Sequence, residues 1–174
     1  MSRNESAALP IAYVVLRIFI VMNWMLGAAI LGLLVATVVA EAWTFTALHI
    51  TSASGIPETI GPLRAVAVLG LTAIPLNDAI LRRLTKMVET VRQGDPFVAA
   101  NAYRLQTIAW FLLVLQLISL AIGAIGKMIS TPAHPIHLDA GFSASGWLAV
   151  ILAFVLARVF VEGALMREDL QGTV

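Results

Sequence analysis

The sequence predicts an all-α membrane protein with four transmembrane helices. The residues are 60% hydrophobic and only 12% charged, the mean hydropathy is +0.92, and the apolar residues gather in four runs, each about as long as the roughly 20 residues that cross a bilayer. Soluble domains are about 25% charged. Most of the surface is therefore expected to face lipid. A length of 174 residues indicates a single domain, residues 1–174.

The four apolar runs predict a four-helix bundle. The expected spans are residues 18–40, 63–83, 106–126 and 146–165. The first is interrupted only by Asn23 and is too long for the apolar part of a cleaved signal peptide. The second is the weakest, because Pro75 removes a backbone donor and is expected to kink the helix, and because Asn77 and Asp78 follow close to its end.

Basic residues are distributed unequally between the segments that flank the spans. Nine lie before the first span, between the second and third, or near and after the end of the fourth: Arg3, Arg17, Arg82, Arg83, Lys86, Arg92, Arg104, Arg158 and Arg167. The other two segments hold Arg64 and Lys127. Because cytoplasmic segments carry the excess of Lys and Arg, we expect a multi-pass protein of the bacterial inner (plasma) membrane with both termini in the cytoplasm.

The charged stretch VRQGDPFVAANAYRL, Val91–Leu105, follows the second span. An apolar face precedes it, formed by Ile80, Leu84, Met87, Val88 and Val91. The helical spacing of these apolar residues predicts that the second helix continues into the cytoplasm as an amphipathic helix. Gly94 is expected to end it as a C-terminal cap, and Asp95 to cap the next helix with Pro96 at its first position. We therefore expect a sharp reversal between two helices.

Polar residues are also expected where the spans reach the cytoplasm. Six of them are predicted at a similar depth: Asp78, Arg82, Asn101, Arg104, Arg158 and Glu162. Two local pairs have the i,i+4 spacing that favours contact on a helix, Asp78 with Arg82 and Arg158 with Glu162. Ionisable groups within spans are costly and normally pair. We expect one polar cluster at the cytoplasmic end; structural support of the bundle is its simpler role, and ligand binding or gating the alternative.

Small residues at four-residue spacing allow helices to approach closely in lipid. The fourth span carries Ser145, Ala149, Ala153 and Ala157, and the first carries Ala28 and Gly32. Packing within the bundle is the simpler interpretation of the stripe on the fourth span. A homodimer formed through it is the alternative.

The two outer loops offer weaker signals. Alternation in Trp43–His49 and the segment Ile136–Leu138 allow a short extracytoplasmic β-hairpin. His134 and His137 have the spacing of zinc ligands, and His49 and Asp139 lie on the same side, but Pro135 stands between the two histidines. No metal site is predicted.

Two motifs carry a resemblance to a known family. Their residues are Gly94, Asp95, Pro96, Phe97, Asn101, Ala102, Arg104 and Leu105, and then Asp169, Leu170, Gly172, Thr173 and Val174. The stretch QGDPFVAANAYRLQTIAW and the tail FVLARVFVEGALMREDLQGTV resemble the bacterial membrane family catalogued as domain of unknown function 2975. The family looks like small four-span proteins with a GDPF-then-NAxRL signature and a DLxGTV ending. Its members are often encoded beside a small soluble helix-turn-helix regulator, which the resemblance implies as a partner.

These observations favour a non-enzymatic regulatory protein. We expect it to bind a small cytoplasmic helix-turn-helix transcription regulator through its cytoplasmic turn and its C-terminal tail, which includes Asp169 and Leu170. A short terminal segment of this kind can be captured by a soluble protein, and an ordinary frayed tail is the alternative. The alternative function is a small oligomeric transporter or channel, since Pro75, Asn77 and Asp78 interrupt one span and Asn23 and Gln116 add polar groups to two others.

Other classes of function are not predicted. The sequence has no HExxH, no GxSxG, no glycine-rich phosphate loop and no cysteine, so we expect no enzyme and no cofactor. The net charge of +1 does not favour direct nucleic-acid binding. The basic residues suit the orientation and the attraction of anionic lipid headgroups, so the expected partners are the lipid bilayer and the soluble regulator.

Overall fold

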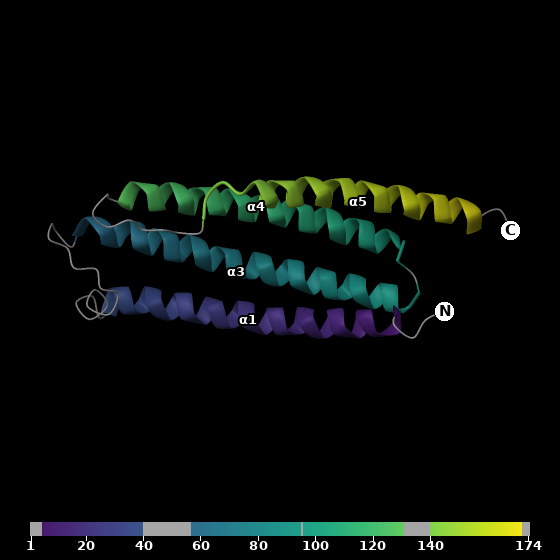
Figure 1. Ribbon diagram of the computed structural model, residues 1–174, viewed down its shortest axis with the longest axis horizontal. Coiled ribbons are helices and arrows are strands. Elements are labelled where there is room, and N and C mark those ends of the chain that lie inside the picture. The colour runs from purple at the N-terminus through teal and green to yellow at the C-terminus, as the bar shows by residue number, and fades with distance from the viewer. Residues whose placement is uncertain (1–4, 40–56, 95, 131–139, 172–174) are drawn as a thin grey trace.

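The chain forms long antiparallel helices that lie side by side (Figure 1). The computed structural model describes residues 5–39, 57–94, 96–130 and 140–171. These residues form α1 (Glu5–Val39), α3 (Pro57–Arg92), α4 (Ala99–Ile129) and α5 (Ala144–Gln171). All four are long and apolar enough to cross a membrane. The predicted spans 63–83, 106–126 and 146–165 fall within α3, α4 and α5, and the span 18–40 falls within α1 except for its last residue, which lies outside the described residues. The predicted all-α membrane fold is confirmed. The residues of the predicted β-hairpin lie outside the described residues.

The helices are longer than the apolar runs that predicted them. α3 has 36 residues, or about 54 Å at 1.5 Å per residue, against a hydrocarbon core of about 30 Å. It runs through Pro62 and Pro75 and ends only at Arg92. The predicted extension of the second helix beyond its apolar run is therefore confirmed, and Pro75 lies inside a continuous helix.

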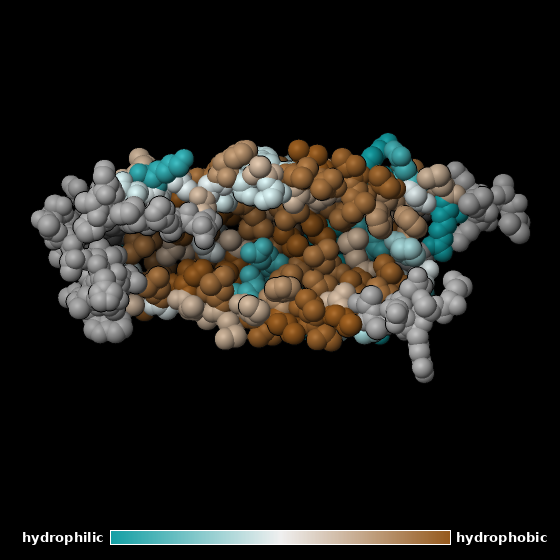
Figure 2. All heavy atoms as spheres, viewed as in Figure 1, coloured by the Kyte–Doolittle hydropathy of each residue, from teal (hydrophilic) through white to brown (hydrophobic). Residues whose placement is uncertain are grey.

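The helices pack in chain order. α1 packs along α3, α3 along α4 and α4 along α5, while the described parts of α1, α4 and α5 show no backbone contact between α1 and either of the last two helices. The bundle is therefore open on the side between α1 and α5. Hydrophobic residues cover most of the face that Figure 2 shows, and most of the large apolar side chains of α1 are exposed. This surface suits lipid rather than water.

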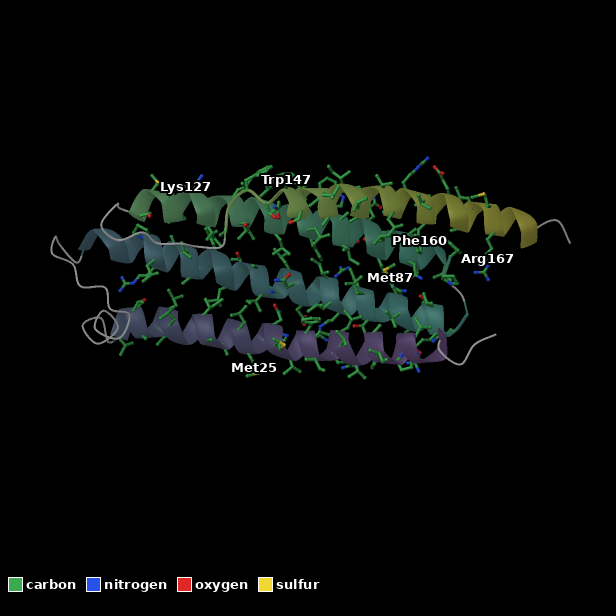
Figure 3. All side chains as sticks on the ribbon, viewed as in Figure 1. Met25, Met87, Lys127, Trp147, Phe160 and Arg167 are labelled. Atoms are coloured by element: carbon green, nitrogen blue, oxygen red, sulfur yellow. The ribbon has the colours of Figure 1, made fainter. Side chains whose placement is uncertain are left out.

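The buried core lies where three helices meet. Its buried members are Ile80 on α3, Leu105 and Ile108 on α4, and Ala157 on α5, with Met87 and Phe160 packed around them (Figure 3). None of these residues lies on α1, so α3, α4 and α5 form the core without it.

Small residues do pack helices together, but not all of the predicted ones. On α5, Ala153 and Ala157 are buried, while Ser145 and Ala149 are exposed, so the predicted stripe is only half correct. The buried face instead continues to Val150. The packing therefore follows a mixed three- and four-residue period, as expected where two helices wind around each other.

On α1 a small residue that contacts α3 is Gly27, which the sequence analysis did not select. A β-carbon added there would lie 3.1 Å from Ile74 Cγ2, whereas at Gly32 it would meet nothing within 4 Å. Gly27 therefore sets how closely α1 approaches α3.

α5 is displaced along the bundle relative to α4. The chain before it lies against α4: Ser119 Oγ donates to the Gly141 carbonyl at 3.3 Å, and Gln116 Nε2 donates to the Ser143 carbonyl at 3.2 Å. Gly123 allows this, because a β-carbon there would lie 2.5 Å from Gly141 Cα. α5 consequently starts beside the middle of α4 and extends beyond the α3–α4 connection at its other end (Figure 1). We call that end, where α1 begins and α5 ends, the turn end.

Candidate functional site

The reversal between α3 and α4 begins as predicted. Gly94 has a φ of +85°, a conformation that glycine adopts at little cost, and its N–H donates to the Val91 carbonyl at 3.0 Å. Gly94 thus lies two positions beyond Arg92, the last residue of α3, as a left-handed cap. This part of the prediction is confirmed.

The start of α4 differs from the prediction. The helix begins at Ala99, its N-cap is Val98 with φ −82° and ψ 141°, and no side chain caps it. The prediction that Pro96 occupies the first helical position is therefore wrong; Asp95 lies outside the described residues. Residues 96–98 are not helical.

Packing of Phe97 against α5 explains this difference. Its ring centroid lies 5.3 Å from that of Phe160, and its Cδ1 lies 2.9 Å from the place of a β-carbon on Gly163. The short extended segment brings the ring to α5, and Gly163 leaves room for it. The contact ties the turn to α5.

Asn101 holds the turn from inside. Its side chain is fully buried; Nδ2 donates to Thr90 Oγ1 at 2.7 Å and to the Pro96 carbonyl at 2.9 Å, and Oδ1 accepts from Arg104 Nη1 at 2.7 Å. The amide therefore links the end of α3, the connection and the first turns of α4. We call Thr90, Pro96, Asn101 and Arg104 the turn centre.

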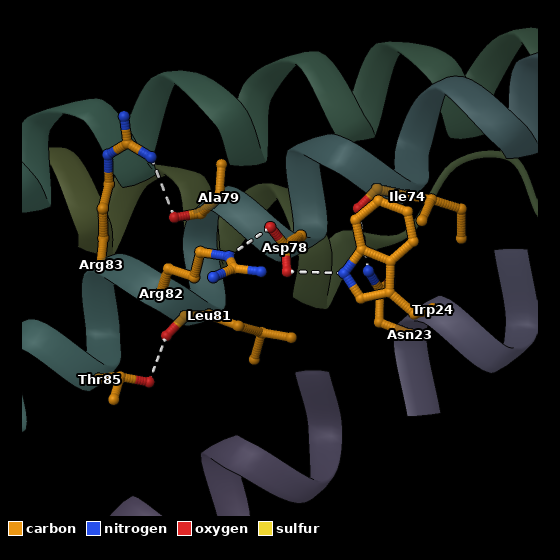
Figure 4. Close-up of polar contacts among 9 residues, drawn as sticks. All are labelled: Asn23, Trp24, Ile74, Asp78, Ala79, Leu81, Arg82, Arg83 and Thr85. Carbon is orange, nitrogen blue, oxygen red and sulfur yellow. Dashed lines mark hydrogen bonds and ion pairs between the residues drawn. The ribbon is translucent and has the colours of Figure 1, made fainter. Parts of the chain in front are cut away.

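A second group of polar residues joins α1 to α3 (Figure 4). Asp78 Oδ1 accepts from Trp24 Nε1 at 3.0 Å, and Asp78 Oδ2 accepts from Arg82 Nε at 2.6 Å. Asn23 Nδ2 donates to the Ile74 carbonyl at 3.0 Å. The predicted pair Asp78–Arg82 is present, and Trp24 adds a bond between helices that the sequence analysis missed. We call Asn23, Trp24, Asp78 and Arg82 the α1–α3 centre.

The predicted polar residues do not form one cluster. Thr90, beside Asn101, lies twelve positions beyond Asp78 on α3, or about 18 Å along the helix. The Arg158–Glu162 pair is present at 2.9 Å, but its side chains are 74% and 55% exposed. Within the described part of the chain, no hydrogen bond joins this pair to either centre. Three separate groups therefore replace the expected cluster.

The C-terminal tail is helical as far as Gln171. Asp169 and Leu170 lie in the last turn of α5. Gly172, Thr173 and Val174, which complete the second motif, lie outside the described residues.

No metal site is found in the part of the chain that the structure describes. No group of three or more His, Asp or Glu side chains there is placed to hold an ion. The residues weighed as zinc ligands, His49, His134, His137 and Asp139, lie outside the described residues.

A family model described as "Protein of unknown function (DUF2975)" matches residues 47–174. The chain belongs to this family. The resemblance based on its two motifs is therefore confirmed. The match covers α3, α4 and α5 and hence the whole turn centre, whereas Asn23 and Trp24 of the α1–α3 centre precede it. No curated protein and no solved structure matches the chain.

The residues missed by the sequence analysis are those that contact a distant segment. Thr90 and Gly163 are ordinary helix residues when read alone, and only the packing pairs them with Asn101 and Phe97. Trp24 had a signal, because it follows Asn23 within an apolar run. Two adjacent side chains with hydrogen-bond donors there indicate a helix contact.

Proposed function

We propose that this DUF2975 member is a non-enzymatic docking platform of the bacterial inner membrane that holds a small helix-turn-helix transcription regulator at the cytoplasmic face. The class of partner is inferred from the family that the two motifs resemble. The proposed docking surface is the part of α5 that projects at the turn end.

The displacement of α5 is the observation that carries this proposal. Phe97 contacts α5 at Gly163, and α5 continues for eight more residues to Gln171, or about 12 Å. Along this projecting end, Leu165 and Met166 are 55% and 62% exposed. Both lie at the end of the candidate span Ala144–Arg167, and exposed apolar side chains at such an end, next to the aqueous side, are a mark of a protein interaction site.

The charge distribution supports a cytoplasmic position for this surface. Arg83, Lys86 and Arg92 follow one another along the last turns of α3, and the excess of Lys and Arg marks the cytoplasmic side of membrane proteins. A soluble regulator is accessible only from that side.

The rigidity of the turn supports the same function. Asn101 and Phe97 tie the reversal to α3, α4 and α5 at once. Interaction sites on helices that are held in place by packing are more accurately positioned than those on loops. These contacts hold α5 at Phe160 and Gly163, where its projecting end begins.

The alternative function, a small transporter or channel, has less support. Gln116 donates to the Ser143 carbonyl, and Asp78 accepts from both Trp24 and Arg82. Asn23 donates to the Ile74 carbonyl as well, so three of the polar groups on which that alternative rests are engaged in holding the bundle. An Asp78→Asn protein in liposomes would show an undiminished solute flux if Asp78 has no part in transport.

Affinity purification tests the docking function. The tagged protein is purified from its own host in mild detergent beside a chain truncated after Leu165 and a Leu165→Ala/Met166→Ala variant. We expect a small helix-turn-helix protein to accompany the full chain and to be lost with both changes. Ile151→Ala/Leu152→Ala, which alters two similarly exposed residues of the same helix, is the matched control. Equal recovery with all four chains, or recovery of the protein alone, would contradict the proposal.

A further inference from the structure

A groove of about 420 Å³ lies between α1, α3 and α4, beside the open side of the bundle. Its walls are apolar and include Phe19, Leu26, Leu81 and Leu112, but two carboxamides, those of Asn23 and Asn77, also line it. The groove thus combines a mainly apolar surface with a few polar groups, as ligand sites do.

The two carboxamides are engaged differently. Asn23 donates to the Ile74 carbonyl, whereas the side chain of Asn77, which is half-buried, makes no hydrogen bond to any residue that the structure describes. Both lie within helices that are candidate membrane spans. Because an amide without a partner in an apolar medium is costly, a molecule that accepts a hydrogen bond from Asn77 would stabilise the protein.

We infer that an anionic phospholipid occupies this groove. One acyl chain lies against the apolar walls, and an ester carbonyl accepts a hydrogen bond from Asn77 Nδ2. A lipid fits because the groove lies within the membrane-spanning helices, and a phospholipid carries its ester acceptors directly beside its apolar chains.

The cations near the groove select an anionic headgroup. Arg83 lies six positions beyond Asn77 on α3, about 9 Å toward the turn end, and Arg17 lies six positions before Asn23 on the neighbouring α1. Neither forms an ion pair among the described residues, where the pairs are Asp78–Arg82, Glu89–Arg92 and Arg158–Glu162; Arg83 lies over the Phe111 ring and Arg17 donates to the Tyr13 hydroxyl. Basic residues near the membrane surface attract anionic lipids.

Native mass spectrometry of the purified full-length chain tests this inference. Delipidated protein is mixed with phosphatidylglycerol or, separately, with phosphatidylcholine, and the fraction that retains one lipid is measured. We expect phosphatidylglycerol to be retained and phosphatidylcholine to be retained less. Asn77→Leu removes the donor, and its loss should weaken retention about three- to tenfold.

Two tryptophan variants separate the groove from the general lipid-facing surface. Leu26→Trp fills the groove and should also weaken retention, whereas Met25→Trp, at an exposed neighbour outside it, should retain lipid as the unaltered chain does. Equal retention by Asn77→Leu, Leu26→Trp and the unaltered chain would overturn the inference, as would equal retention of the two lipids or a dimer mass in place of lipid adducts. Recovery of the soluble regulator is a separate readout, so this inference and the docking function can fail independently.

Discussion

Asn101 in the turn centre and Asp78 in the α1–α3 centre are both polar side chains among apolar helices, yet they find their partners at different separations along the chain. Asn101 bonds to residues no more than 11 positions away. Asp78 combines a neighbour, Arg82, with Trp24, which lies 54 positions away. The first centre therefore shapes one turn, and the second joins two helices that are far apart in the sequence.

The two centres also differ in burial. Asn101 is fully buried, whereas the side chain of Asp78 is 13% exposed and that of its partner Arg82 is 60% exposed. A buried group has no solvent to replace a lost partner, so the turn centre should be the more sensitive to substitution. The α1–α3 centre matters for a different reason: it helps to hold α1, which packs on no described helix except α3.

The largest effect is expected at Asn101. Asn101→Leu leaves Thr90, the Pro96 carbonyl and Arg104 without their shared partner and should lower the free energy of unfolding by about 2–4 kcal/mol. Circular dichroism during denaturation in mixed micelles measures this change. Tyr103→Leu, an exposed position on the same turns of α4, is the control and should have little effect. Similar losses for both variants would show that burial of the amide is not what stabilises the turn.

A smaller effect is expected where α1 approaches α3. Gly27→Val places methyl groups against Ile74, where even a β-carbon would lie at 3.1 Å, and should cost about 1–3 kcal/mol. Gly32→Val carries the same cost of a β-branched residue in a helix but meets open space. Because the chain has no cysteine, a spin-label pair introduced across α1 and α3 would measure their separation. A distance that changes equally in both variants would contradict the predicted contact.

The bond from Trp24 to Asp78 should contribute less. Trp24→Phe keeps an aromatic ring but removes the indole donor, and hydrogen bonds between membrane helices average roughly 0.6 kcal/mol with values up to about 1.7. We expect a loss of about 1 kcal/mol, measured by the same denaturation. Trp110→Phe is the matched control, since that indole is packed edge-on against Phe154. An equal loss in the control would assign the effect to ring size.

The smallest effect is expected for the exposed pair on α5. Arg158→Ala should change the free energy of unfolding by less than about 0.5 kcal/mol, because exposed ion pairs contribute little. A double-mutant cycle with Glu162→Ala measures the coupling. A coupling above about 1 kcal/mol would contradict the small contribution expected of an exposed pair.

Local patterns predicted the features whose partners lie within a few residues. The apolar runs located the four helices, Gly94 was placed as the cap of α3, and the pairs Asp78–Arg82 and Arg158–Glu162 followed from i,i+4 spacing. The same rules failed at Pro96, because its conformation depends on Phe97 reaching α5. They also placed Asn101 and Asp78 at one depth, since the true lengths of the helices were not visible in the apolar runs.

The sequence by itself determined the helices and their local contacts, because backbone geometry relates a helical residue to its neighbours in the same way wherever the helix lies. Only the tertiary structure decided that α1 packs on α3 and on no other described helix, that α5 extends beyond the turn, and that Thr90 accepts a hydrogen bond from the amide of Asn101. The reason is physical. In lipid, apolar burial does not order helices against one another, so their relative positions depend on a few close contacts, such as Gly27 with Ile74 and Gly163 with Phe97.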